Sequence, residues 1–497
     1  MAEPVWLGVD LGTQSVRALA VDGTGRQVAA AARPLTGHRD GPRHEQDPAH
    51  WWAATEEALA AVTERLTGRP VGALAVCATS GTVLLTDPDG TPRTPGLMYD
   101  DTRAGDLAAQ AQEAGADLWA TLGYRMQPAW ALPKLLWWRD QGLLTGDARL
   151  AHQPDVITAA LVGHPVASDT SHVLKTGYDL VADRWPEPIL RRLRLDPAML
   201  PQVVRPGTVL GTVRPAAART TGLPVGTPVV AGMTDGCAAQ LAAGALDIGQ
   251  WNTVLGTTLA VKGVSRRLPQ DPTGAVYSHR APHADRWLPG GASSTGAGAI
   301  RALFPDADQP ALAALTAAAA RVTEVPLCYP LVGQGERFPF VAPLARGFLG
   351  AGPLLADEGR ASEHDDPTRF AAVCTGVAHV ERLSFELLAA AGCDVGGPVA
   401  FTGGAARNDW WNQLRCDLLG VPVRLPENPE PGLGMAVLAA GAVGGDIPAA
   451  ARRLVRLRRA LIPDPARTEA LLPGYRAFVA ELAGRGWLDP RLTERST

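Results

Sequence analysis

Lysine is nearly absent from this sequence. Its 497 residues include 46 basic side chains, yet only Lys134, Lys175 and Lys262 are lysines. None of the three follows a glycine, so the phosphate-binding signature GxxxxGK followed by Ser or Thr cannot occur. The patterns GxGxxG and GxSxG are absent as well. These absences exclude ordinary P-loop binding, Rossmann-type dinucleotide binding and serine-hydrolase chemistry.

Paired cysteines, excess charge and long apolar runs are also missing. The six cysteines stand singly, without CxxC spacing or the density of a disulfide scaffold, so reduced thiols are expected. The 46 basic and 50 acidic residues nearly balance, which leaves no basic stripe for nucleic acid or an anionic membrane. Acidic Glu3 and Asp10 stand where a signal peptide needs a basic and then an apolar run, and no apolar stretch reaches the ~18 residues of a membrane span. A cytoplasmic protein is therefore expected.

The first part of the chain predicts an α/β fold. Apolar runs at Val5–Asp10, Val16–Val21 and Gln27–Arg33 are separated by turn residues, which predicts an antiparallel meander. A helix from Pro48 to Leu66, with an aspartate as its N-cap, then leads to a strand at Val71–Cys77. A meander followed by a helix and a strand indicates a mixed sheet covered by helices.

A second copy of this opening lies in the middle of the sequence. The segment Trp251–Lys262 has the same strand, Gly-Thr turn and strand as Leu7–Val21. Two such hairpins a domain's length apart suggest a duplicated fold whose halves face each other across a cleft. The predicted domains are 1–245 and 246–445, followed by a helical tail at 446–497, in which the arginine-rich Arg452–Arg459 stretch is interpreted as solvated helix.

A βαβ unit is predicted inside the second domain. A helical pattern over Phe370–Leu388 leads to a strand at Pro398–Thr402, the turn Gly403–Asn408, a helix ending at Leu419 and a strand at Val421–Leu425. Its Gly-rich turn follows the carboxyl end of a strand, where open sheets bind ligands.

The two Gly-Thr turns are the candidate phosphate sites. Turns such as Gly12-Thr13 and Gly256-Thr257-Thr258 present backbone N–H groups and hydroxyls, which can surround an anion without a lysine. Asp10 ends the first strand, where burial beside phosphates is costly unless a divalent cation compensates it. Mg²⁺, held largely through water, is the expected ion.

Asp235 is the candidate general base. It lies between the predicted strand Pro228–Ala231 and an alanine-rich helix, a position that also suits an N-cap. A lone carboxylate can accept the proton of an attacking hydroxyl in phosphoryl transfer, because the loose transition state needs little activation of the nucleophile.

Four segments together resemble the FGGY carbohydrate kinases, in their order and rough spacing to about residue 445: Gly8-Val9-Asp10-Leu11-Gly12-Thr13, Gly232-Met233-Thr234-Asp235-Gly236, Leu255-Gly256-Thr257-Thr258 and Gly403-Gly404-Ala405-Ala406-Arg407-Asn408. The resemblance implies two actin-like (ribonuclease H-like) α/β domains with a nucleotide and sugar cleft between them. It also implies that Asp235 is the catalytic base, that Asp10 binds metal and phosphate, and that Thr13 is a phosphate-loop threonine.

Shorter motifs resemble the D-ribulokinases of cyanobacteria and plants, a xylulose kinase-like branch of the family: Ala78-Thr79-Ser80-Gly81-Thr82, Leu174-Lys175-Thr176-Gly177-Tyr178, Tyr277-Ser278-His279, Gly290-Gly291-Ala292-Ser293 and Gly335-Glu336-Arg337-Phe338-Pro339. Asp101-Thr102-Arg103 resembles the sugar-side Asp-x-Arg of the wider family. The resemblance implies sugar contacts at Asp10, Ser80, Asp101 and Asp235. The implied nucleotide contacts are Gly12, Thr13, Gln14, Gly256, Thr257, Thr258, Gly404, Ala405, Asn408 and Trp411.

The expected activity is transfer of the γ-phosphate of ATP, with Mg²⁺, to the terminal hydroxyl of a ketopentose. D-Ribulose is the first choice of sugar, and another pentulose or a polyol such as D-xylulose is the alternative. A nucleotide-dependent chaperone or filament protein is a further alternative on the same fold, disfavoured by Asp235 in its motif. The expected partners are sugar and ATP, with neither nucleic acid nor membrane, and the protein is expected to be a monomer or a homodimer.

Overall fold

The structure, a computed structural model, describes residues 3–355 and 364–488. The chain divides into two units, each assembled from separated segments. Unit 1 comprises 1–246, 279–288 and 427–456, and unit 2 comprises 247–278, 289–426 and 457–497. Over the described ranges, none of the helices combines the length and apolarity needed to cross a bilayer.

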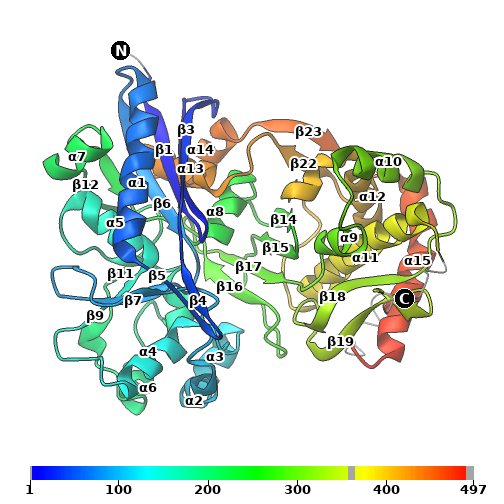
Figure 1. The fold of residues 1–497 in the computed structure, drawn as a ribbon, viewed down its shortest axis with the longest axis horizontal. Helices are drawn as coiled ribbons and strands as arrows, with labels where there is room; N and C mark the ends of the chain where they lie inside the picture. The colour runs from blue at the N-terminus through cyan, green and yellow to red at the C-terminus, as the bar shows by residue number, and fades with distance from the viewer. Residues whose placement is uncertain (1–2, 356–363, 489–497) are drawn as a thin grey trace. The chain divides into compact units, whose positions relative to one another are not determined.

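A six-stranded mixed sheet forms the centre of unit 1 (Figure 1). Its spatial order is β12 (Val209–Thr212), β13 (Pro228–Val230), β6 (Val71–Ala78), β1 (Val5–Leu11), β2 (Ser15–Val21) and β3 (Gln27–Pro34). The strands β13, β6 and β1 run parallel, whereas β2, β3 and β12 are antiparallel to their neighbours. The carboxyl ends of three adjacent strands therefore meet at one edge.

The helices of unit 1 pack on this sheet or continue beyond it: α1 (Pro48–Thr63), α2 (Ala108–Ala114), α3 (Ala116–Leu122), α4 (Ala131–Asp140), α5 (Gln153–Val162), α6 (Glu187–Arg192), α7 (Pro215–Thr221), α8 (Asp235–Ala242), α13 (Pro431–Gly444) and α14 (Ile447–Leu454). Five short strands make a second sheet: β4 (His38–Asp40), β5 (Arg43–Gln46), β8 (Gly96–Leu97), β7 (Val83–Thr86) and β9 (Arg149–His152). A further pair is β10 (Ser168–Asp169) with β11 (Val203–Val204).

Unit 2 repeats the strand order and directions of unit 1. Its seven-stranded sheet runs β23 (Leu457–Leu461), β22 (Val423–Pro426), β21 (Val399–Thr402), β14 (Trp251–Leu255), β15 (Leu259–Gly263), β17 (Trp287–Ala292) and β16 (Tyr277–Arg280). The segment 279–288, counted with unit 1, takes in the end of β16 and the start of β17. As in unit 1, the three central strands are parallel and their neighbours on both sides are antiparallel. The duplication expected from the two Gly-Thr hairpins is thus present in the sheets themselves.

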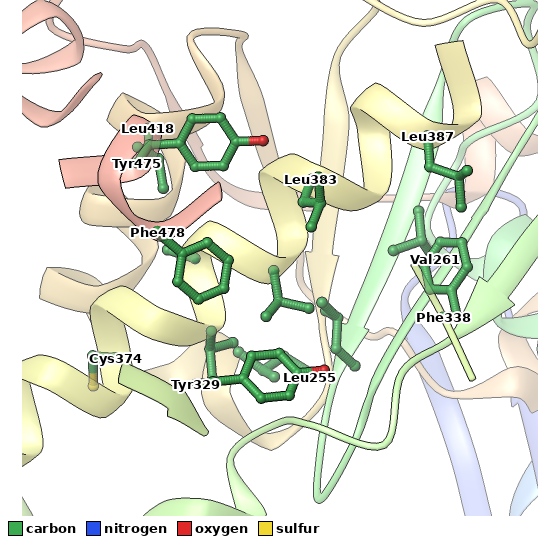
Figure 2. Close-up of a cluster of buried hydrophobic side chains, with 14 of the residues drawn as sticks. Leu255, Val261, Tyr329, Phe338, Cys374, Leu383, Leu387, Leu418, Tyr475 and Phe478 are labelled. Atoms are coloured by element: carbon green, nitrogen blue, oxygen red, sulfur yellow. The ribbon is translucent and has the colours of Figure 1, made fainter. Parts of the chain in front are cut away.

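Helices and a small sheet complete unit 2. The helices are α9 (Gly298–Leu303), α10 (Gln309–Ala319), α11 (Asp366–Ala390), α12 (Asp409–Leu419) and α15 (Pro465–Gly484), and the small sheet is β18 (Cys328–Glu336), β19 (Ala342–Leu349) and β20 (Gly352–Pro353). Figure 2 shows part of the core they share, where side chains of α11 and α15 gather in one cluster with side chains of β14 and β15. Tyr475 and Phe478 of α15 are 1% and 0% exposed, so this helix is part of the core.

The described part of the predicted tail, 446–488, does not form a separate element, because it is divided between the units, with α14 in unit 1 and β23 with α15 in unit 2. The rest of the predicted tail, 489–497, lies outside the described residues. The Arg452–Arg459 stretch is not one solvated helix, because α14 ends at Leu454 and β23 pairs with β22 from Leu457.

The compact units do not divide at the predicted boundary of residue 445. Helix α13 belongs to unit 1, where its backbone packs directly against the backbone of β1. A Cβ atom on Gly8 would lie 1.7 Å from the carbonyl oxygen of Gly432, and one on Gly434 would lie 1.9 Å from that of Ala238 in α8. Glycine on both sides makes this close approach possible.

Candidate active site

Three predicted site residues follow neighbouring parallel strands of unit 1. Asp10 lies near the end of β1, in register with Cys77 of β6. Ser80 comes just after β6, and Thr234, which precedes Asp235, bridges to Ala78 at the end of that strand. Because the strands are parallel, all three side chains belong to one edge of the sheet, where open α/β sheets bind ligands.

The Asp10 carboxyl has a raised pKa. Burial and, after it, the nearby negative charge of Asp235 together raise this pKa to about 6. Burial, together with these two carboxylates, also raises the pKa of Cys77 well above its usual value. The Cys77 thiol therefore stays protonated and donates to Asp10 Oδ1 across 3.6 Å.

A divalent cation suits this arrangement, because it would offset the cost of a buried carboxylate beside a second one. Within 3–355 and 364–488, no three acidic, histidine or cysteine side chains gather as a chelating group. A cation at Asp10 would accordingly keep water and phosphate oxygens as most of its ligands, which is the habit of Mg²⁺.

Asp235 is the first residue of α8, and Thr234 occupies the N-cap position. The carboxylate is half-buried, and its Oδ1 accepts the backbone N–H of Gly236 at 2.7 Å. The turn that leads to it passes close to β6, since a Cβ atom on Gly232 would lie 1.8 Å from the carbonyl oxygen of Val76. This approach fixes the place where α8 begins, and with it the position of Asp235.

Ser80 presents a hydroxyl that is available to a ligand. Its Oγ is buried and has no hydrogen-bond partner among the described residues, whereas its carbonyl oxygen accepts from Lys175 Nζ at 2.8 Å. An unsatisfied hydroxyl in a site without water is costly, and a sugar hydroxyl would satisfy it. The contact between Ser80 and sugar stays a prediction, and this geometry suits it.

Unlike the Ser80 hydroxyl, the Asp101 carboxylate has partners within the protein, and its sugar contact stays a prediction. The residue is 0% exposed, and its carboxylate accepts the Arg103 guanidinium and the backbone N–H of His44. The side chain of Arg103 also pairs with Glu45 at 2.7 Å and lies over the ring of Trp137. The Asp-x-Arg motif thus forms an internal ion pair in which Asp101 positions Arg103.

The first Gly-Thr turn is anchored at its backbone. Gly12 donates its N–H to the carbonyl of Ser15 at 3.1 Å, and the carbonyl of Thr13 accepts from Gln46 Nε2 at 2.7 Å. Gly12 and Thr13 are half-buried, and Gln14 is exposed. The Gly12 amide is thus engaged within the turn, which leaves the Thr13 hydroxyl and the later amides as the candidate phosphate donors.

The second turn, in unit 2, is built in the same way. Gly256 donates to the carbonyl of Thr258 at 3.0 Å, while the carbonyls of Gly256 and Thr257 accept from Ala297 and Gly298 at 2.9 and 3.0 Å. Thr257 is exposed, and Gly256 and Thr258 are half-buried. Backbone hydrogen bonds therefore hold both turns, and each turn carries a threonine that is at least partly exposed, Thr13 and Thr257.

The predicted adenine turn lies after β21. Gly403 has φ +83°, and a Cβ atom there would be 2.6 Å from the carbonyl oxygen of Leu255, so only glycine fits. Gly404 is exposed and Ala405 half-buried in the short turn that follows. Asn408 caps α12 by accepting Trp411 N–H at 3.0 Å, and its Nδ2 donates to Thr316 of α10.

Trp411, the predicted adenine contact, lies inside unit 2. The indole is 2% exposed, and its Nε1 donates to the carbonyl of Cys374 in α11 at 2.9 Å. The ring therefore packs in the core, and Trp410 is the half-buried member of this pair.

Sequence reasoning missed a buried polar segment of unit 1. His172 is 0% exposed, and its Nδ1 lies 2.5 Å from Asp169 Oδ2. Burial opposes a charged imidazole, but the Asp169 carboxylate outweighs it and raises the pKa of His172. Ser171 Oγ accepts the backbone N–H of Thr234 at 2.9 Å, which holds this segment beside Asp235. The available signal was the polar run 168–172, which precedes a motif already singled out.

Comparison with known proteins agrees with this geometry. The model of the N-terminal domain of the FGGY family of carbohydrate kinases matches residues 5–242, and that of the C-terminal domain matches 251–443. The chain is 34% identical over 495 residues to a protein named xylulose kinase from Streptomyces coelicolor, with 97% of each chain covered. It is 31% identical over 462 residues to the one named xylulose kinase from Streptomyces rubiginosus, with 90% of each covered.

A solved structure gives the same result. The crystal structure of xylulose kinase from Rhodospirillum rubrum has a TM-score of 0.84 and 27% identity, and the match covers 97% of this chain and 98% of that one. The two-domain α/β fold expected from the sequence is confirmed. The closer resemblance to D-ribulokinases is not confirmed by these relatives.

Proposed function

Because this chain belongs to the FGGY family of carbohydrate kinases, we propose that it phosphorylates the terminal hydroxyl of a ketopentose with ATP, and that D-xylulose is the sugar. Membership of the family makes the protein a phosphotransferase with an alcohol group as acceptor. The observation that carries the finer proposal is the placement of Asp10, Ser80 and Asp235 at the ends of three neighbouring parallel strands. The names of its relatives support D-xylulose better than D-ribulose, our first choice from the sequence.

The chemistry assigned to the residues follows from their positions. Asp235 accepts the proton of the attacking sugar hydroxyl as the oxygen–phosphorus bond forms, and ADP leaves with the electron pair of the broken bond. The protein keeps Asp235 half-buried at the start of α8, so its carboxylate stays accessible to a substrate. Ser80 Oγ donates to or accepts from a hydroxyl of the same sugar.

The nucleotide side is assigned to the two Gly-Thr turns. The hydroxyls of Thr13 and Thr257 are proposed to contact phosphate oxygens, each from a turn that its own hydrogen bonds hold rigid. When bound, Mg²⁺ supplies positive charge that neutralises the triphosphate, and Asp10 is the residue proposed to hold it. Gly404, Ala405 and Asn408 are proposed to form the adenine end.

A panel assay tests the proposal. ADP release is measured with D-xylulose, D-ribulose, L-xylulose, xylitol and glycerol, each with and without Mg²⁺. The expected result is the largest kcat/KM for D-xylulose, and a larger value for D-ribulose would instead support the original choice. Activity with none of the five would contradict a pentulose kinase.

Asp235→Asn tests the assigned base. The amide keeps the shape of the carboxylate but cannot accept the proton, so kcat is expected to fall about 10²–10⁴-fold while ATP binding persists. Asp89→Asn, an exposed position of the same unit, is the matched control and is expected to leave kcat unchanged. Wild-type kcat in Asp235→Asn would remove Asp235 from the mechanism.

A further inference from the structure

Two of the three lysines converge on one turn. Lys175 Nζ donates to the carbonyl of Ser80 at 2.8 Å, and Lys134 Nζ donates to the carbonyl of Gly81 at 2.9 Å. The two carbonyls belong to consecutive residues, although the lysines lie far apart in the sequence. We propose that Lys134 and Lys175 are positioning residues that clamp the Ser80-Gly81 turn, aim the Ser80 hydroxyl at the sugar and so set sugar specificity; this inference rests on the function proposed above.

Lys134 holds the turn from inside the protein. It lies in α4, is 0% exposed, and also donates to the carbonyl of Met98 at 2.6 Å. Burial lowers its pKa to about 7, while the negative charge of Asp101 acts in the opposite direction. A buried amine is costly to a fold. Hydrogen bonds to the carbonyls of Gly81 and Met98 offset this cost, and through them Lys134 links two separate loops.

Lys175 holds the turn from the other side. It lies in the 3₁₀ turn Val173–Thr176 and is half-buried. Gly81 has φ +99°, and a Cβ atom there would lie 3.1 Å from Lys175 Cδ. The glycine therefore lets the lysine stem lie against the turn. Both consecutive carbonyls are fixed, while Ser80 Oγ between them keeps no partner among the described residues.

The chemistry of lysine explains why arginine does not take these places. The sequence has 43 arginines against three lysines, so arginine is its ordinary basic residue. A guanidinium is a planar fork suited to two oxygens of one carboxylate, whereas an ammonium is a compact donor whose N–H bonds can point at separate carbonyls. An ammonium therefore suits two carbonyls from different loops, as at Lys134, and a carbonyl of a tight turn, as at Lys175.

The test is a double-mutant cycle between Ser80 and Lys175, read by calorimetric binding of D-xylulose and D-ribulose without ATP and by steady-state kinetics. Ser80→Ala alone is expected to weaken sugar binding about ten- to hundredfold. Lys175→Met alone is expected to weaken sugar binding about tenfold and to change the ratio of the affinities for D-xylulose and D-ribulose. It is expected to leave the KM for ATP within twofold of the wild-type value. In the Lys175→Met background, Ser80→Ala is expected to cost less than threefold, because the hydroxyl is no longer aimed.

Further variants separate positioning from general stability. Lys175→Arg is expected to behave like Lys175→Met, since the charge stays but the donor geometry changes. Arg191→Met, which removes an exposed cation of the same unit, is the control and is expected to bind both sugars as the wild type does. Lys134→Met is expected to shift the sugar ratio in the same direction, measured only on protein whose melting temperature shows it folded.

The outcomes are distinct. Additive losses from Ser80→Ala and Lys175→Met, or an unchanged sugar ratio in both lysine variants, would overturn the clamp while leaving the proposed kinase intact. Wild-type protein that neither binds nor phosphorylates either ketopentose would overturn the proposed function, and the clamp with it.

Discussion

Asp10 is expected to lower the stability of the folded protein above about pH 6. Its carboxyl has a pKa of about 6 in the folded protein against 3.8 as an ordinary aspartate, because burial and Asp235 disfavour its charge. Between these two values the folded chain keeps a proton that the unfolded chain has released. The stability linked to that proton is fully present below pH 4 and is lost as the pH rises through about 6.

The magnitude follows from the difference of about two pKa units. Each unit corresponds to about 1.4 kcal/mol, so the charged carboxylate costs on the order of 2–3 kcal/mol above pH 7. Asp10→Asn keeps the shape and removes the charge. It is expected to raise the melting temperature by several degrees at pH 8 and to leave it nearly unchanged at pH 4.

The assay is thermal unfolding of the wild type and Asp10→Asn from pH 4 to 8, with and without Mg²⁺. Mg²⁺ is expected to stabilise the wild type at pH 8 and to have little effect on the variant. Asp89→Asn, at an exposed position, is the control. A melting temperature of Asp10→Asn below that of the wild type at pH 8 would refute the electrostatic reasoning. So would a rise in melting temperature at pH 4 as large as the rise at pH 8.

Two further predictions concern the nucleotide and the core of unit 2. Thr13→Val and Thr257→Val, which delete only a hydroxyl, are each expected to raise the KM for ATP about three- to tenfold and to leave the KM for sugar unchanged in kinetic assays. Glu381→Gln leaves the fully buried Arg415 guanidinium without its charged partner and is expected to cost ~3–5 kcal/mol in denaturant unfolding. Glu187→Gln, in an exposed ion pair, is expected to cost less than ~1 kcal/mol.

The sheets could be predicted because their signals are local. The meander at β1 to β3 and the hairpin of β14 with β15 are apolar runs separated by turn residues, and the structure places all five strands within a residue or two of the expected bounds. Both ends of the first long helix also follow from local signals. Asp47 caps its start by accepting the N–H of Ala49, and α1 continues into a 3₁₀ turn that ends at Leu66.

The features that the sequence did not predict share one physical cause, which is a partner distant in sequence. Trp410 and Trp411 are adjacent, and only the position of α11 decides which indole is buried. The Asp-x-Arg motif does not show that the Asp101 carboxylate also accepts the backbone N–H of His44, far from it in the sequence. Strand β23 is exposed at four of its five positions, so it lacks the alternation that identifies a strand until β22 pairs with it.

The segment from Asp169 to Thr176 shows the same limit at the site itself. Ser171 binds the backbone before Asp235, and Lys175 binds the backbone of Ser80, so one short segment contacts both loops that carry the proposed sugar and base residues. The strands determine at which edge of the sheet these residues lie, and the sequence predicts those strands. Their mutual orientation depends on buried hydrogen bonds from this third segment, and a buried polar side chain has no periodic pattern to mark it. A substitution in this segment should therefore alter sugar binding and catalysis together, whereas a substitution in one loop alters one of them.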